Sequence, residues 1–136
     1  MTNKITSEYK KCALLWSHVA NEPGGTCRTC CIAKNRIQDS DGIDMNLSTH
    51  TMSEILSSQY VENIRQEIRE DNEPENCETC WIDERKGKTS KRQNSIYKMR
   101  SSLENWTPNS EPTLKFIDFK LGNVCNLKCR ICGSWS

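Results

Sequence analysis

The sequence predicts an α+β fold: a small, cysteine-rich, metal-stabilised domain with a β-hairpin and helices, followed by one strand and a cysteine loop. The chain of 136 residues has nine cysteines, 35% hydrophobic and 27% charged residues. Its apolar core is therefore small, and bound metal is one means of stabilising such a domain. Short apolar segments and turn residues come first, helical periodicity follows, and strand-like alternation comes last.

The N-terminal part of the chain predicts a hairpin. Residues 12–16 are apolar and are expected to form a short strand or a buried turn. The turn-forming sequence 22–25, Glu-Pro-Gly-Gly, comes next, and residues 27–32 supply the second arm. Cysteines then lie on both arms, and the polar residues 33–50 are expected to be loop.

Helices are expected from Thr51 onward, because Thr51 and Glu54 have the spacing of a capping box. Apolar residues recur at helical intervals through Glu70, with a break near Ser57 and Ser58. The segment 81–103 is charged and is expected to be partly helical, with an interruption at Gly87. Residues 105–112 are a predicted linker, and residues 113–121 alternate like a strand.

The net charge of +1 argues against a strongly electrostatic partner, so we expect neither nucleic acid nor an anionic membrane surface. The sequence has no apolar run long enough to cross a bilayer and no secretory signal. We therefore expect a cytoplasmic protein with reduced thiols. An odd number of cysteines also fits a disulfide framework poorly.

The C-terminal cysteines follow the predicted strand at the spacing C-x3-C-x2-C, and they are Cys125, Cys129 and Cys132. Three thiolates on a [4Fe–4S] cluster leave one iron open, as catalytic metal sites do. This sequence, CNLKCRIC, closely resembles the cluster loop of radical S-adenosylmethionine (radical SAM) enzymes. The resemblance implies that these cysteines ligate a [4Fe–4S] cluster whose open iron binds S-adenosylmethionine. It also implies that residues 113–121 are the first strand of an incomplete (β/α) barrel.

The N-terminal cysteines have the arrangement C…G-x4-C…C-x2-C, within the phrases GGTCRTCC, SEILSSQYVENIRQEIRE and PENCETCWIDE. This order resembles the SPASM or twitch domain, an auxiliary-cluster module of radical SAM enzymes. The resemblance implies that one auxiliary [4Fe–4S] cluster is held by Cys12, Cys30, Cys77 and Cys80. Cys27 and Cys31 compete with Cys30 for its position.

The residues alone also permit other functions. Cys27-x2-Cys30 with Cys77-x2-Cys80 is a legitimate four-cysteine zinc site, which would make the chain a zinc-binding module that mediates protein interaction. A cluster-bearing electron carrier without S-adenosylmethionine is a third hypothesis. His18 is a weak candidate ligand, and Trp81 and Trp106 are expected to pack over the metal site or the linker. The basic stretch 85–92 is expected to be a solvated face.

The resulting hypothesis divides the chain into an auxiliary-cluster domain (1–90), a helical segment and linker (91–112) and the start of a radical SAM domain (113–136). The function expected from the resemblance is reductive cleavage of S-adenosylmethionine and radical chemistry on a peptide or protein. The sequence identifies no catalytic residue beyond the cluster ligands. We expect a fragment or a split protein whose barrel is completed by a separate chain, and which is inactive alone.

Overall fold

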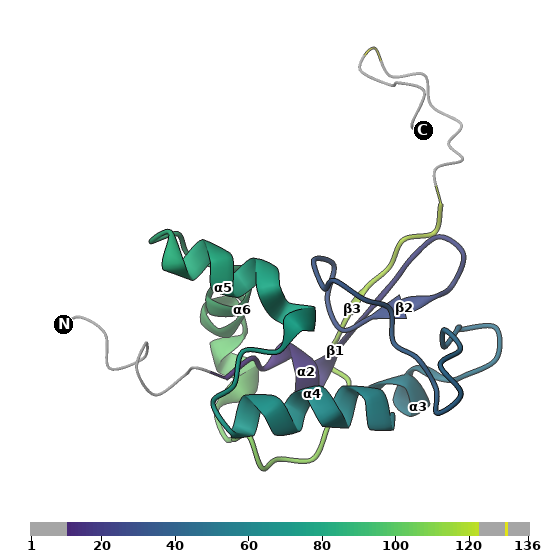
Figure 1. The fold of residues 1–136 in the computed structure, drawn as a ribbon, viewed down its shortest axis with the longest axis horizontal. Coiled ribbons are helices and arrows are strands. Elements are labelled where there is room, and N and C mark those ends of the chain that lie inside the picture. Colours follow the sequence, from purple (N-terminus) through teal and green to yellow (C-terminus); the bar gives the residue numbers. More distant parts are fainter. Residues whose placement is uncertain (1–10, 123–129, 131–136) are drawn as a thin grey trace.

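The computed structural model describes residues 11–122 and Arg130. This part of the chain has an α+β fold in which the helices lie beside a small mixed sheet (Figure 1). The strands are β1 (His18–Asn21), β2 (Cys27–Arg28) and β3 (Phe116–Asp118). The helices are α2 (Leu14–Ser17), α3 (Met52–Leu56), α4 (Gln59–Arg69), α5 (Glu78–Arg85) and α6 (Lys91–Met99), with 3-10 turns η1 (Glu75–Cys77) and η2 (Arg100–Leu103).

The antiparallel pair β1 and β2, in which Ala20 lies opposite Arg28, confirms a hairpin around the predicted turn. Its first arm is His18–Asn21 and not residues 12–16, so the prediction of cysteines on both arms is wrong. Its turn closes through a 2.8 Å hydrogen bond from Gly25 N to Glu22 O. Gly25 has a φ of +89°, and a Cβ atom here would lie 2.5 Å from Asn46 Oδ1, so the turn requires glycine. The preceding apolar segment is not a strand. It forms the single helical turn α2, whose four residues are all buried.

The helical predictions are confirmed for the middle of the chain. Thr51 and Glu54 form the expected capping box of α3, and Ser58 begins α4 by accepting a hydrogen bond from Val61 N. The predicted break therefore separates α3 from α4. Gly87, with a φ of +73°, lies in the turn between α5 and α6.

The core lies between the sheet and the helices. Side chains from α2, β1, α3, α4 and α5 contribute to it, among them Trp16, Val19, Ile55, Ile68 and Trp81. Arg65 of α4 is also buried, with 1% exposure. Its Nε donates to Leu15 O at 2.8 Å, another guanidinium nitrogen donates to Leu56 O, and Glu62 supplies a carboxylate at 3.0 Å. These bonds satisfy a charge that burial would otherwise make costly.

The strand predicted at 113–121 is shorter in the structure. Only Phe116–Asp118 form β3, which pairs with β1 in parallel and brings His18 opposite Phe116. Asn21 holds the following residues, because its side chain exchanges hydrogen bonds with the backbone of Lys120. No helix within the described residues is long and apolar enough to cross a membrane.

Candidate metal centre

A largely enclosed, apolar cavity contains four of the predicted ligands. Cys12, Cys30, Cys77 and Cys80 all line it, and we call it the cysteine cavity. Apolar and polar neighbours complete its wall: Leu14, Ile32, Ala33, Asn76, Thr79, Trp81, Lys91 and Arg92. The structure therefore brings together three segments that are far apart in sequence. The six described cysteines form no disulfide.

Cys12 is held at the cavity by its neighbour Lys11. The Lys11 ammonium donates to the last carbonyls of α4, Ile68 O at 2.8 Å and Arg69 O at 3.2 Å, and pairs with Asp71 at 2.6 Å. A cation at a helix C-terminus satisfies free carbonyls and interacts favourably with the helix dipole. These contacts fix the start of α2 against the end of α4, which positions Cys12.

Cys30 lies in the turn that follows β2. Ala33 N donates to Cys30 O at 3.1 Å, and the Arg28 side chain bridges the same turn by donating to Ala33 O at 2.6 Å. Arg28 is itself held by Glu22, whose carboxylate lies 2.9 Å from Arg28 Nε. The hairpin and its closing turn thus present Cys30 to the cavity.

Cys77 and Cys80 come from the junction of η1 and α5. Cys77 is the N-cap residue of α5, and Cys80 follows three positions later inside that helix. Residues three apart in a helical turn lie on the same side, so both thiols can face the cavity. The two-residue spacing that indicated a chelating pair in the sequence therefore has this structural basis.

Asn76 joins the two halves of the cavity. Its side chain donates to Thr29 Oγ1 at 3.1 Å and accepts from Asn35 N at 2.9 Å, while its carbonyl accepts from Lys34 N at 3.0 Å. Asn76 is 6% exposed and Thr29 is 3% exposed. These buried hydrogen bonds hold the turn containing Cys30 against the turn containing Cys77.

Cys27 and Cys31, which compete with Cys30 as ligands, lie outside the cavity wall. Cys27 is fully buried in the hydrophobic core, where its thiol contacts Gly25 O at 3.5 Å, and it does not line the cysteine cavity. Cys31 does not line the cysteine cavity either. The set of Cys27, Cys30, Cys77 and Cys80 considered for zinc is therefore not brought together, whereas Cys12 takes the place of Cys27.

Burial and mutual proximity make three of the cavity thiols poor acids. Burial, followed by the nearby Cys30, raises the pKa of Cys12 to about 12. The pKa of Cys77 is also raised, by burial and then by Cys12, Cys30 and Cys80. Burial likewise raises the pKa of Cys30. Thiolates that share one apolar cavity need a cation to stabilise them.

The chemistry of the four donors suits a metal centre, since both zinc and a [4Fe–4S] cluster accept four thiolates. One wall residue has an unsatisfied polar atom: Trp81 Nε1 is buried and has no hydrogen-bond partner among the residues that the structure describes. The cavity has a volume of about 20 Å³, room for about one water molecule. Across residues 11–122 and Arg130, no group of three or more His, Cys, Asp or Glu side chains has the arrangement of a metal site. Metal binding therefore requires the thiols to adjust their side chains.

The remaining site predictions fall in different places. Cys125, Cys129 and Cys132 lie outside the described residues. His18 is not in the cavity wall, and its Nδ1 lies 3.2 Å from Thr29 O. Trp81 packs against the cysteine cavity as expected. In the basic stretch Lys86 and Lys88 are exposed, but Arg92 is 5% exposed and pairs with Glu84, so the prediction of a solvated face is wrong at that residue.

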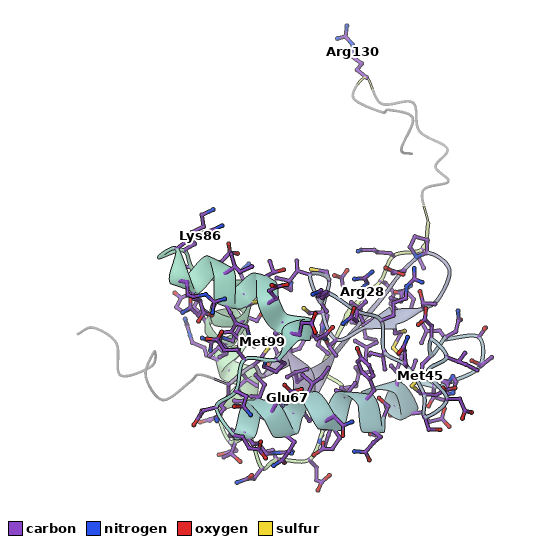
Figure 2. The ribbon with its side chains drawn as sticks, viewed as in Figure 1. Arg28, Met45, Glu67, Lys86, Met99 and Arg130 are labelled. Atoms are coloured by element: carbon purple, nitrogen blue, oxygen red, sulfur yellow. The ribbon has the colours of Figure 1, made fainter. Side chains whose placement is uncertain are left out.

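Sequence reasoning missed Asn76, Lys91 and Arg92. Asn76 had a usable signal, because it precedes a cysteine of a chelating pair and polar neighbours of ligands often orient them. Figure 2 shows the side chains of the described residues, with sulfur in yellow. Lys91 and Arg92 begin α6, and only the packing of α6 on α5 brings them to the cavity.

No protein-family model, curated protein or solved structure matches this chain.

Proposed function

We propose that this chain is an iron–sulfur protein that forms the N-terminal part of a radical SAM enzyme. In this proposal the cysteine cavity holds an auxiliary [4Fe–4S] cluster, and Cys125, Cys129 and Cys132 hold a second cluster that binds S-adenosylmethionine. The full enzyme would reductively cleave S-adenosylmethionine and act on a peptide or protein. A separate chain or a further segment would complete the barrel.

The observation that carries the proposal is the shared cavity of Cys12, Cys30, Cys77 and Cys80. The SPASM-like order of the sequence selects these four cysteines, and the fold places the same four around one apolar space. Cys27 packs in the core instead, although it lies closer in sequence to Cys30 than Cys12 does. Four thiols around one apolar cavity, with the pKa values of Cys12, Cys30 and Cys77 raised, are a poor arrangement unless a cation binds them.

The path of the chain gives secondary support. Strand β3 pairs with β1, so the segment leading to the C-terminal cysteines begins from the sheet next to the auxiliary site. Phe116, Ile117, Phe119 and Leu121 remain exposed along this segment, with exposures from 37% to 87%. A parallel strand with apolar side chains on both faces is typical of a sheet that is covered by further structure.

The small volume of the cavity favours a second candidate, a zinc-binding module that mediates protein interaction. A single ion occupies less space than a cluster, and about 20 Å³ is close to the volume that one water requires. The same four thiols would then form a structural zinc site. In that case the chain would carry no redox-active centre in this domain.

Metal analysis of variants separates these functions. The protein is purified and reconstituted without oxygen, and iron, sulfide and zinc are measured in the wild type, in Cys12→Ser/Cys77→Ser and in Cys125→Ser/Cys129→Ser. We expect about eight irons in the wild type and about half as many in each double variant. Cys31→Ser is the matched control and should keep the full iron content. Stoichiometric zinc with no iron would contradict the proposal and favour the second candidate.

A further inference from the structure

Trp81 is a tryptophan of α5 that lines the cysteine cavity and is 7% exposed. Its indole Nε1–H is buried and has no acceptor among the residues that the structure describes. A buried N–H group without a partner costs free energy comparable to a lost hydrogen bond. The same cavity is lined by Cys12, Cys30, Cys77 and Cys80, whose thiols would become anionic sulfur on binding metal.

The ring of Trp81 is held in place by Arg92, which also lines the cysteine cavity. The guanidinium carbon of Arg92 lies 4.8 Å from the ring centroid, which is a cation–π geometry. Glu84 fixes Arg92 by accepting from Nε at 2.9 Å and from Nη2 at 2.6 Å. Ser90 Oγ donates to the same carboxylate at 2.6 Å, which ties the start of α6 to α5. The indole is therefore oriented by α6 while it forms part of the cavity wall.

We infer that Trp81 is a hydrogen-bond donor for the metal centre, with its indole N–H directed to a thiolate or sulfide sulfur in the cysteine cavity. The inference rests on the metal-binding part of the proposed function and is independent of S-adenosylmethionine. A sulfur acceptor of this kind would satisfy Trp81 Nε1, a buried atom that has no hydrogen-bond partner within the described part of the chain. Hydrogen bonds to cluster sulfurs are also a principal means by which proteins set reduction potentials.

The donor has a defined chemical effect. An N–H···S hydrogen bond stabilises negative charge on sulfur, and a reduced cluster carries one more electron than an oxidised one. The bond therefore favours the reduced form and raises the reduction potential. Trp81→Phe removes the N–H donor and keeps an aromatic ring in the cavity wall. Loss of one charge-assisted hydrogen bond corresponds to about a tenfold change in the ratio of reduced to oxidised protein.

The first test uses the zinc-loaded protein, so that it does not depend on a cluster. Indole N–H resonances are recorded in ¹⁵N-tryptophan-labelled protein with and without zinc, and Trp81→Phe assigns its signal. We expect the Trp81 proton to move downfield and to exchange more slowly with solvent when zinc is bound. Trp106 is the matched control, because its Nε1 is also buried and unpartnered among the described residues but lies outside the cysteine cavity. A Trp81 signal that does not change on zinc loading, or a cavity that binds no metal, overturns the inference.

The second test measures reduction potential in the iron-loaded protein. Trp81→Phe should lower the potential of the auxiliary cluster by about 59 mV, the equivalent of a tenfold change for one electron. Trp106→Phe should leave it unchanged, and thermal unfolding should show that both variants fold. Equal potentials in the wild type and Trp81→Phe, at full iron content, would overturn the inference while leaving the cluster itself established. Failure of the proposed function would instead appear as the absence of iron.

Discussion

Asn76 Nδ2 donates a 3.1 Å hydrogen bond to Thr29 Oγ1, and the two residues immediately precede Cys77 and Cys30. The bond is buried and joins segments 47 residues apart. Two more hydrogen bonds join Asn76 to the backbone of Lys34 and Asn35. The separation of two cavity thiols is therefore set by one asparagine.

Replacing Asn76 tests this relationship. Asn76→Ala leaves Thr29 and the Asn35 N–H without their buried partner, which should lower the free energy of unfolding by about 2 kcal/mol. Metal affinity should fall by about tenfold to a hundredfold, as for other residues that orient ligands. Urea unfolding and metal titration measure the two effects. Asn63→Ala, an exposed change in α4, is the control, and an equal loss in both variants would contradict the role of Asn76.

Cys27 and Cys30 should respond differently to the same substitution. Cys30→Ala should remove a ligand and lower the metal content of the cavity. Cys27→Ala should keep the metal but lower the free energy of unfolding by about 1–2 kcal/mol, because it removes a packed atom from the core. Metal analysis and urea unfolding distinguish the two. Loss of metal in Cys27→Ala, with Cys30→Ala unaffected, would show that the ligand set is wrong.

Arg65 should be a major contributor to stability. Arg65→Met retains the apolar volume but leaves the carbonyls of Leu15 and Leu56 without a donor, which should cost about 2–4 kcal/mol. Chemical unfolding measures this change. Arg100→Met is the control: Arg100 is exposed and lies over the Tyr97 ring, so its loss should cost less than about 0.5 kcal/mol. A cost for Arg65→Met as small as that of the control would contradict its structural role.

His18 should make the fold sensitive to mild acid. Burial lowers the pKa of His18, and the nearby charge of Lys91 acts in the same direction, against the Thr29 carbonyl and Asp118. The unfolded chain therefore binds a proton at a higher pH than the folded protein does. The stability from neutral His18 is complete above a pH of about 6.5 and is lost as the pH falls towards the folded-state pKa.

The variant His18→Gln isolates this effect, because it cannot titrate. Between pH 7 and pH 5 the thermal midpoint of the wild type should fall more than that of His18→Gln. His50→Gln, just before α3, is the control and should show the same fall in thermal midpoint between pH 7 and pH 5 as the wild type. Identical pH dependence in the wild type and His18→Gln would show that His18 does not contribute.

The elements that could be predicted are those encoded by neighbouring residues. The capping box at Thr51, the break near Ser57 and the interruption at Gly87 all depend on contacts within a few positions. The segment 12–16 could not be assigned, because its apolar pattern fits a buried helical turn as well as a strand. Its conformation is decided by packing against α4, where Arg65 satisfies the Leu15 carbonyl.

The candidate site could likewise be predicted from the sequence only in part. The resemblance to the SPASM or twitch domain selected the four residues that share the cavity, whereas cysteine spacing alone selected Cys27 in place of Cys12. Spacing could not show that Cys27 belongs to the core, since that depends on the position of the hairpin relative to α3 and α4. The burial of Arg92 was also hidden, because its partner Glu84 lies on another helix. Charge patterns along a chain do not reveal which charges are paired across elements.

The central claim, two clusters of which one binds S-adenosylmethionine, is tested most directly by EPR of the reduced, anaerobically reconstituted protein with and without S-adenosylmethionine. We predict that S-adenosylmethionine changes the spectrum of the wild type and of Cys12→Ser/Cys77→Ser but not that of Cys125→Ser/Cys129→Ser. A spectrum that does not respond in the wild type, despite a full iron content, would contradict the claim and leave an electron carrier.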